Sequence, residues 1–377
     1  MMNARVLAST GLQQLFEVLA RQQYTVIGPT IRDGAIVHDE IASERELPIG
    51  WTDEQQPGRY RLLARDDQAR FGYRVGPHAW KRPLVPPEVR LWRARRDNGR
   101  LVFEPARPAP VQLAFLGVRP CDVAALAILD RVYLEGPYVD PGYRARRAAT
   151  LVIAVNCTEP GGTCFCASMG TGPRASGGFD LALTERIDRD RHEFVVEVGT
   201  TRGAAVLEAI DGAREASPAD LEAVADATAR AAARMGRQLE TDGLRDLLYG
   251  RLDDPAWDEV AARCLTCANC TLACPTCFCS TTEDRPDLAG GGAERWKRWD
   301  SCFTREFSYI HGGFMRSSAR ARYRQWMTHK LAGWHDQFGS SGCVGCGRCL
   351  TWCPAGIDIT EEARRIRAEA PASRAIV

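Results

Sequence analysis

CLTCANCTLACP, residues 264–275, sets four cysteines in the spacing C-x2-C-x2-C-x3-C and follows them with a proline. CVGCGRCLTWCP, residues 343–354, repeats that spacing at every position. The two runs form the one convincing internal repeat of the chain. They decide the fold, because the rest of the C-terminal region has to bring two short cysteine loops together.

This spacing is that of the bacterial ferredoxin run, whose thiolates bind [4Fe–4S] clusters. Three cysteines, each separated by two residues, reach three irons of one cube. The fourth, held away by three residues and the proline turn, reaches the other cube. The first predicted cluster is bound by Cys264, Cys267, Cys270 and Cys353. The second is bound by Cys343, Cys346, Cys349 and Cys274.

Zinc is the main alternative to iron at these runs, because a zinc ribbon also pairs CxxC units. Two runs that both end in Cys-Pro with this spacing are poorly explained by zinc. Small residues fill both loops, with Ala268 and Asn269 in the first and Gly345 and Gly347 in the second. Such residues let backbone amides approach the sulfides, and those hydrogen bonds tune the reduction potential.

The segment between Cys274 and Cys343 is far longer than a compact two-cluster ferredoxin contains. It holds three further cysteines, Cys277, Cys279 and Cys302, and a long basic and aromatic helix is expected near Thr304–Trp334. The three cysteines could extend a cluster site, form a redox pair, or be buried thiols beside the clusters. These three interpretations stay open on the sequence alone.

Composition is that of an ordinary globular protein, with 45% hydrophobic and 26% charged residues in 377. The formal net charge of +1 gives no overall field that favours nucleic acid or an acidic membrane. No stretch approaches the ~20 apolar residues of a membrane span, and the N-terminus lacks an apolar signal segment. We therefore expect a cytoplasmic protein whose 15 cysteines are metal ligands rather than disulfides.

The expected fold class is α+β. Residues 1–245 are expected to form an α/β domain, and residues 246–377 a mainly helical ferredoxin-like domain with a long helical insert and a polar tail. The sequence predicts a strand at Val111–Val118, a helix at Cys121–Tyr133 and a second strand at Leu151–Asn156. This order suits a βαβ unit in a parallel sheet. An amphipathic helix is expected at Ser9–Gln22, and Ser217 is a natural N-cap for a helix that begins at Pro218.

Four cysteines of the N-terminal domain follow the two predicted strands of that unit. Cys121 and Cys157 come directly after them, and Cys164 and Cys166 come a few residues later. Because open α/β sheets place their sites at the carboxyl ends of parallel strands, these thiols are expected on one rim. They suffice for a third [4Fe–4S] cluster. Buried reduced thiols, a structural zinc, and ligands shared between the two Cys-Phe-Cys triplets are the alternatives.

Catalytic signatures are absent from the sequence. No G-x-G-x-x-G follows a strand, so we expect no flavin or nicotinamide site in this chain. No nickel–iron, sirohaem or nucleophile motif is recognisable either. We therefore expect no catalytic residue in this chain, and the chemistry at each end of an electron path is expected to belong to partner subunits.

The chain resembles the beta (iron–sulfur) subunit of cytoplasmic NAD(P)-linked nickel–iron hydrogenases, also called sulfhydrogenases. It is also similar to the A subunit of anaerobic sulfite reductase, a close relative of that subunit. The resemblance runs from about Val111 onward. It rests on the two cysteine runs and on GVRPCD (117–122), NC (156–157), GGTCFC (161–166), PTCFC (275–279) and WDSC (299–302).

The resemblance implies a non-catalytic electron-transfer subunit with a flavin- and NAD(P)H-binding subunit on one side. On the other side it implies a nickel–iron hydrogenase small subunit, or a sirohaem subunit in the sulfite reductase alternative. A free-standing ferredoxin-like carrier and an iron–sulfur sensor are alternatives of another class. Arg316, Arg320 and Arg324 form a basic run that is either a solvated face or a docking surface for a partner.

Overall fold

The computed structural model describes residues 4–106, 111–188 and 191–368, so most of the predicted polar tail lies outside the described residues. The strands are β1 (Ala4–Ala8), β2 (Thr25–Arg32), β3 (Ala35–Glu40), β4 (Trp51–Gln56), β5 (Arg59–Ala64), β6 (Glu88–Asp97), β7 (Arg100–Pro105), β8 (Leu113–Val118), β9 (Thr150–Val155), β10 (Leu181–Ile187), β11 (His192–Val198), β12 (Arg214–Glu215), β13 (Ser280–Pro286), β14 (Gly292–Trp299), β15 (Tyr309–Ile310) and β16 (Gly313–Phe314).

The α-helices are α1 (Gly11–Arg21), α2 (Lys81–Leu84), α3 (Pro120–Tyr133), α4 (Pro141–Ala148), α5 (Thr201–Glu208), α6 (Pro218–Ala233), α7 (Leu244–Gly250), α8 (Ala256–Arg263), α9 (Asn269–Leu272), α10 (Ala319–Thr328), α11 (Trp334–Phe338), α12 (Arg348–Thr351) and α13 (Ile359–Ala368). Two 3-10 turns, η1 (Glu44–Glu46) and η2 (Glu306–Ser308), and one π-helical turn, η3 (His329–Gly333), complete the described elements. This mixture of helices and sheets agrees with the α+β expectation.

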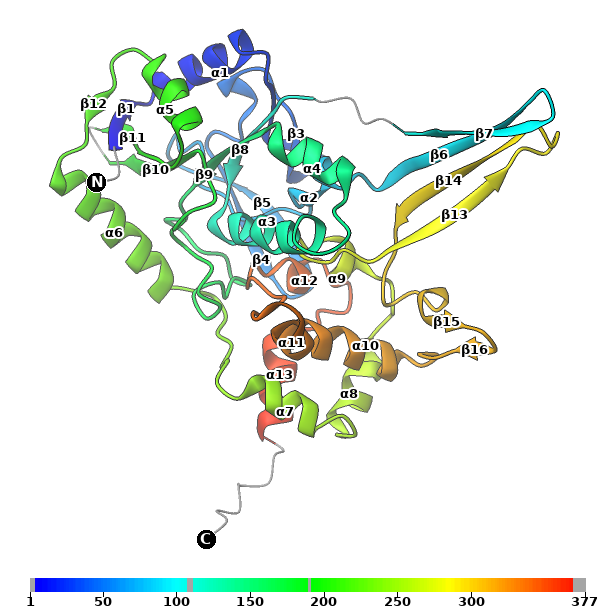
Figure 1. Cartoon of the computed structure of the whole chain (residues 1–377). Coiled ribbons are helices and arrows are strands. Elements are labelled where there is room, and N and C mark those ends of the chain that lie inside the picture. Colours follow the sequence, from blue (N-terminus) through cyan, green and yellow to red (C-terminus); the bar gives the residue numbers. More distant parts are fainter. Residues whose placement is uncertain (1–3, 107–110, 189–190, 369–377) are drawn as a thin grey trace.

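An eight-stranded sheet with the order β12-β1-β11-β10-β9-β8-β2-β3 organises the N-terminal half (Figure 1). Strands β2, β8, β9 and β10 run parallel to one another, and the remaining pairs of the sheet are antiparallel. Every residue of β8 and β9 is buried, as expected for parallel strands covered on both faces. The predicted βαβ unit is confirmed as β8-α3-β9.

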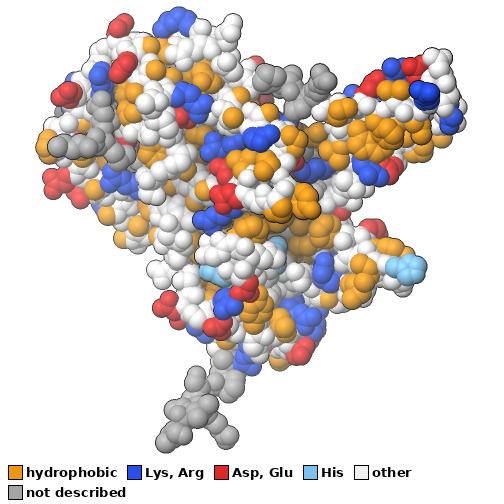
Figure 2. Space-filling model, in the orientation of Figure 1, with side chains coloured by type: hydrophobic (Ala, Val, Ile, Leu, Met, Phe, Trp, Pro, Cys, Tyr) orange, Lys and Arg blue, Asp and Glu red, His pale blue; other side chains and the backbone are white. Residues whose placement is uncertain are grey.

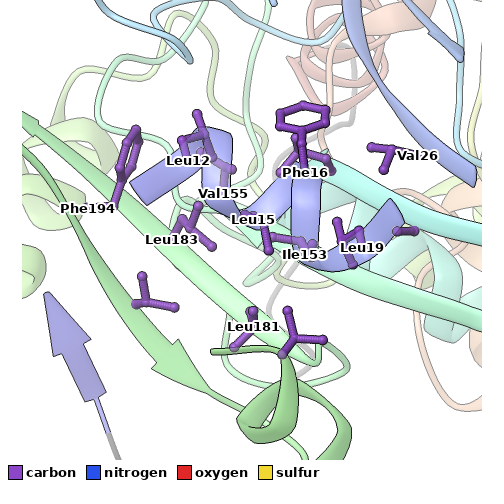
Figure 3. Packing of buried hydrophobic residues seen from close by; sticks show 14 of the residues in the cluster. Leu12, Leu15, Phe16, Leu19, Val26, Ile153, Val155, Leu181, Leu183 and Phe194 are labelled. Carbon is purple, nitrogen blue, oxygen red and sulfur yellow. The ribbon is translucent and has the colours of Figure 1, made fainter. Parts of the chain in front are cut away.

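Helix α1 covers one face of this sheet. Its apolar residues Leu12, Leu15, Phe16 and Leu19 pack against side chains of β9, β10 and β11 (Figure 3). The helical period of these residues therefore predicted both the helix and its buried side. Ser217 is also confirmed as an N-cap, because its hydroxyl accepts a hydrogen bond from the Asp220 N–H in a capping box.

A second sheet, ordered β13-β14-β6-β7, projects away from the rest of the molecule (Figure 1). Strands β13 and β14 come from the segment between the cysteine runs, and β14 pairs with β6 of the N-terminal half. Apolar side chains gather on this projecting sheet (Figure 2), and Leu101 and Phe103 of β7 are exposed. The sheet therefore takes strands from both sides of the predicted domain boundary.

The prediction of a long helical insert is wrong in its first part. Residues 280–299 form β13 and β14, because their partner strand β6 comes from a distant part of the chain that local periodicity cannot reveal. The predicted helix at Thr304–Trp334 begins at Ala319, after the glycines Gly312 and Gly313. Ser318 starts it by accepting a hydrogen bond from the Ala321 N–H.

The basic run on α10 makes contacts within the chain. Arg320 pairs with Asp258 of α8 at 3.0 Å, and Arg324 pairs with Asp253 at 3.5 Å. These arginines therefore tie α10 to α8, which leads into the first cysteine run, and to the turn just before α8. Within the described residues, no helix combines the length and apolar character needed to cross a membrane.

Among the ion pairs that join the two halves of the molecule, that of Arg348 with Asp122 is fully buried. Arg348, between two cysteines of the second run, donates to both carboxylate oxygens of Asp122 at 2.7 and 2.9 Å. The two side chains are 0% and 1% exposed. Arg348 also donates to the backbone oxygen of Gly76 at 2.9 Å. Because Asp122 directly follows Cys121, this pair fixes the second cysteine run against the N-terminal cysteines.

Asp122→Asn is expected to lower the free energy of unfolding by about 3–5 kcal/mol, because it leaves the Arg348 charge buried without its partner. Denaturant unfolding of the full chain under anaerobic conditions measures this change. The double variant Asp122→Leu with Arg348→Met removes both charges and should recover much of the loss. A single variant as stable as the unchanged chain would contradict the role given to this pair.

Candidate iron–sulfur centres

The first cysteine run leaves helix α8 at Cys264, its C-cap, and turns tightly. Thr266 and Ala268 have positive φ angles of 50° and 68°, and Ala268 is the N-cap of the short helix α9. The turn directs the Thr266 N–H at the Cys264 sulfur, 3.4 Å away. A backbone wound in this way presents N–H donors to the side on which the thiols gather.

The second run repeats this geometry with glycines at the left-handed positions. Gly345 and Gly347 have φ angles of 63° and 78°, and the Gly345 N–H lies 3.4 Å from the Cys343 sulfur. The Ile357 N–H lies 3.4 Å from the Cys353 sulfur. Backbone donors close to sulfur are a feature of cluster-binding loops, where they stabilise negative charge on the thiolates.

The fourth cysteine of each run lies with the other run. Cys264, Cys267, Cys270 and Cys353 line one cavity, which Cys349 of the second run also lines, together with aromatic side chains that include Phe303 and Tyr323. Burial, and then the charges of Cys264, Cys353 and Cys267, raise the pKa of Cys270 well above its usual value. The pKa of Cys349 is likewise raised well above its usual value, first by burial and then by the charges of Cys343, Cys346 and Cys274. Cys353 therefore lies with the first run and Cys274 adjoins the second, while the exchange of ligands between the two clusters stays a prediction.

The four N-terminal cysteines also form one group. Cys121 lies in the first turn of α3, Cys157 follows β9, and Cys164 and Cys166 lie in the next loop. Burial raises the pKa of all four thiols, that of Cys164 to about 12, and Cys157 adds to this effect on the other three. The loop is attached to the second run, because the Phe165 N–H donates to the Gly345 oxygen at 2.8 Å.

The three groups of thiols adjoin one another in series. Cys346 of the second run packs in one buried cluster with Cys121 and Cys166, and it raises the pKa of both thiols and of Cys164. On its other side, the second run meets the first, where Cys270 raises the pKa of Cys349. The thiols of the second run therefore lie between the N-terminal group and the first run.

These groups fit [4Fe–4S] clusters, because each supplies four thiols and two of them have backbone N–H groups close to sulfur. In the described part of the chain, no three His, Cys, Asp or Glu side chains converge as the ligands of a single metal ion would. A cube does not require such convergence, since each thiolate binds a different iron.

Cys277, Cys279 and Cys302 lie beside these groups. Cys277 lies beside Cys274, and Cys279 beside Cys302, and the neighbouring Cys302 thiol lowers the pKa of Cys279 to about 7. The two Cys-Phe-Cys triplets therefore contact different cysteines: Cys164 and Cys166 lie with the N-terminal group, and Cys277 and Cys279 with Cys274 and Cys302.

Two buried lysines, which the sequence analysis missed, lie among these thiols. Lys330 of η3 donates to the Cys274 sulfur at 3.3 Å, and Lys81 of α2 donates to the Cys277 backbone oxygen at 2.9 Å. Burial lowers the pKa of Lys81. Burial also acts to lower the pKa of Lys330, but nearby thiols outweigh it and raise that pKa well above its usual value. No sequence signal marks either lysine, because each stands alone in a helical segment.

Gly347→Ala is expected to destabilise the chain by about 1–3 kcal/mol more than Gly339→Ala. Both glycines have positive φ angles, 78° and 70°. A Cβ on Gly347 would lie 2.5 Å from the Thr163 oxygen, whereas one on Gly339 meets nothing within 4 Å. Denaturant unfolding and iron content of both variants test this, and equal losses would show that the contact with Thr163 does not constrain the second run.

Comparison with known proteins agrees with this geometry. A family model described as a 4Fe-4S dicluster domain matches residues 263–357, which contain both cysteine runs. The chain is also 34% identical, over 249 residues, to sulfhydrogenase 2 subunit beta of Pyrococcus furiosus. That match covers 66% of this chain and 72% of the relative.

The dicluster domain establishes that the chain binds [4Fe–4S] clusters. The match to the relative extends well beyond that domain, because 249 residues are far more than the domain contains. On these grounds the chain is an iron–sulfur electron-transfer subunit, and it belongs to the family of sulfhydrogenase beta subunits.

Proposed function

We propose that this chain relays electrons between a flavin- and NAD(P)H-binding subunit and a nickel–iron hydrogenase module. The observation that carries the proposal is the series of three thiol groups, each adjoining the next. A series of electron-carrying centres within one chain suits a subunit that connects two partners. The name of the Pyrococcus furiosus relative favours hydrogenase over sulfite reductase as the terminal module.

Three [4Fe–4S] clusters are proposed, each held by one group. The ligands of the first are Cys264, Cys267, Cys270 and Cys353; those of the second are Cys343, Cys346, Cys349 and Cys274; those of the third are Cys121, Cys157, Cys164 and Cys166. Cys277, Cys279 and Cys302 are proposed as thiols that bind no iron. The second cluster would occupy the middle of the path, because its ligands adjoin both other groups.

A bound [4Fe–4S] cluster supplies one-electron redox chemistry. The chain itself holds the thiols, buries them, and directs backbone N–H groups at Cys264, Cys343 and Cys353. Burial excludes water from most of the thiols, and Cys267 is the exposed one. The first group therefore comes nearest to solvent, and it is the end at which we propose that a partner subunit approaches.

Affinity purification of the tagged chain from its native cells under anaerobic conditions tests the proposed partners. We expect it to recover a stable complex that contains flavin and nickel and that couples NAD(P)H to hydrogen. Recovery of sirohaem would instead support the sulfite reductase alternative. Recovery of the chain alone, as a monomer loaded with iron, would support a free-standing carrier and overturn the proposal.

Cys267→Ser is expected to remove about four irons per chain, because one cube loses a ligand. Electron transfer between the partners should fall with it. The matched control is Cys302→Ser, which removes a thiol from the same domain and should leave the iron content unchanged. Iron and sulfide analysis of both proteins, purified anaerobically, decides the assignment. Full iron in Cys267→Ser, or equal losses in the two variants, would count against it.

The N-terminal group is tested by the double variant Cys121→Ser with Cys157→Ser. The unchanged chain should contain about twelve irons and no zinc, and the variant about eight, because the third cube is lost. The EPR signals of the reduced clusters at the other two groups should persist. An unchanged chain with about eight irons would refute the third cluster, and zinc lost from the variant would identify the site as a zinc site.

A further inference from the structure

Lys330 and Lys81 are buried ammonium groups that pair with no carboxylate in the described part of the chain. Each lysine is 5% exposed. Among the ion pairs of the described residues, neither lysine contacts an aspartate or a glutamate. By contrast Arg348, which is also buried beside the cysteines, has its charge balanced by Asp122 at 2.7 Å. A buried charge is costly unless an opposite charge compensates it, so the two lysines require an anion that the carboxylates do not provide.

Lys330 points at the ligand set of the proposed second cluster. Its ammonium group donates to the Cys274 sulfur at 3.3 Å, to the Thr276 hydroxyl at 3.0 Å and to the Gly342 oxygen at 3.2 Å. These three contacts hold the nitrogen beside the two cysteine loops, since Gly342 directly precedes Cys343. Every donor position of the ammonium group is thereby directed toward this region.

The backbone around Lys330 is specialised. Residues His329–Gly333 form a π-helical turn within the helical segment that runs from α10 to α11. Such turns cost stability and occur frequently at functional sites. The turn is also fixed to the loop before the second run, because the Gly342 N–H donates to the Lys330 backbone oxygen at 2.8 Å. The fold therefore holds this lysine by both its backbone and its side chain.

Lys81 provides a natural comparison. Its nitrogen donates to the backbone oxygens of Cys277 and Thr271 and lies 4.3 Å from the centre of the Trp299 ring. It makes no hydrogen bond to sulfur among the described contacts. Lys81 thus brings a second buried ammonium group to the same region without touching a proposed cluster ligand.

We propose that Lys330 is a positioning residue that raises the reduction potential of the cluster held by Cys343, Cys346, Cys349 and Cys274. This inference rests on the proposed function, which places a cluster at those cysteines. Hydrogen bonds to sulfur and net charge are the terms by which a protein sets such potentials. A donor to the Cys274 sulfur and a nearby positive charge both favour the form of the cluster that carries the additional electron.

The position of this cluster gives the effect a consequence for electron flow. The second group of thiols adjoins both other groups, because Cys346 packs in one buried cluster with Cys121 and Cys166, and Cys349 lines the cavity of the first run, so an electron that crosses the chain would pass through it. If the reduction potential of the second cluster were higher than those of its two neighbours, an electron would reside preferentially on this middle cluster. The chain would then hold one electron ready while a partner that works in two-electron steps completes its reaction.

Potentiometric titration followed by EPR on the anaerobically prepared full chain tests the proposal. Lys330→Met should lower the equilibrium constant for reduction of the second cluster at least tenfold. For a one-electron couple, this corresponds to a reduction potential lower by at least 59 mV. Lys330→Arg should restore most of the original potential, because it keeps a charged donor. The signal of the second cluster is identified as the one lost in Cys346→Ser.

Lys81→Met is the matched control, since it removes a buried ammonium group that does not contact sulfur. It should shift the same potential by less than Lys330→Met does. An equal or larger shift in Lys81→Met would overturn the proposal, and so would an unchanged potential in Lys330→Met with full iron. If Lys330→Met fails to hold iron, Lys330→Gln decides, because it removes the charge and keeps an N–H donor. A lowered potential supports the proposal and an unchanged one refutes it.

The outcomes separate this inference from the function on which it rests. If the unsubstituted chain has reducible clusters and the Lys330 variants have the same potential, only the proposed role of Lys330 is refuted. An unchanged chain without a reducible cluster at the second group refutes the proposed function and the inference with it.

Discussion

The pairing of Arg348 with Asp122 is the interaction on which the rest of the arrangement depends. Both side chains are fully buried, and the two hydrogen bonds between them fix orientation as well as distance. Arg348 lies inside the second cysteine run, and Asp122 lies beside Cys121 in the first turn of α3. This contact therefore helps to place two groups of thiols next to each other, and it does so with no net charge. Lys330 differs because its charge has no such partner.

Close backbone approach is the second constraint on the site. Gly345 and Gly347 have positive φ angles, and a Cβ on either would collide with the loop that carries Cys164 and Cys166. The glycines thus have two effects. They allow the tight turns of the second cysteine run, and they leave room for the backbone of the neighbouring loop. Buried apolar side chains surround this contact, among them Phe165 and Val344. The thiol groups are consequently parts of one packed unit, and a change at one group is expected to be felt at the next.

The projecting sheet is built in part from the segment between the two cysteine runs. Strands β13 and β14 extend from a point just after the first cysteine run, and β14 pairs with β6 of the N-terminal half, whose other neighbour is β7. The segment between the cysteine runs therefore has two roles. Its first part builds a surface with exposed Leu101 and Phe103 nearby, and its second part, from α10 to α11, delivers Lys330 to the thiols.

The sequence by itself determined what depends on short spacing. The ferredoxin spacing indicated two cluster loops and the exchange of their fourth cysteines, and the pattern of apolar residues indicated α1, α3 and the strands beside it. Spacing works here because a loop of two or three residues has few conformations. Only the tertiary structure decided that residues 280–299 pair with β6, that Cys346 adjoins the N-terminal thiols, and that Lys330 contacts Cys274. These contacts join residues far apart in the chain, so packing of the whole molecule, not local pattern, sets them.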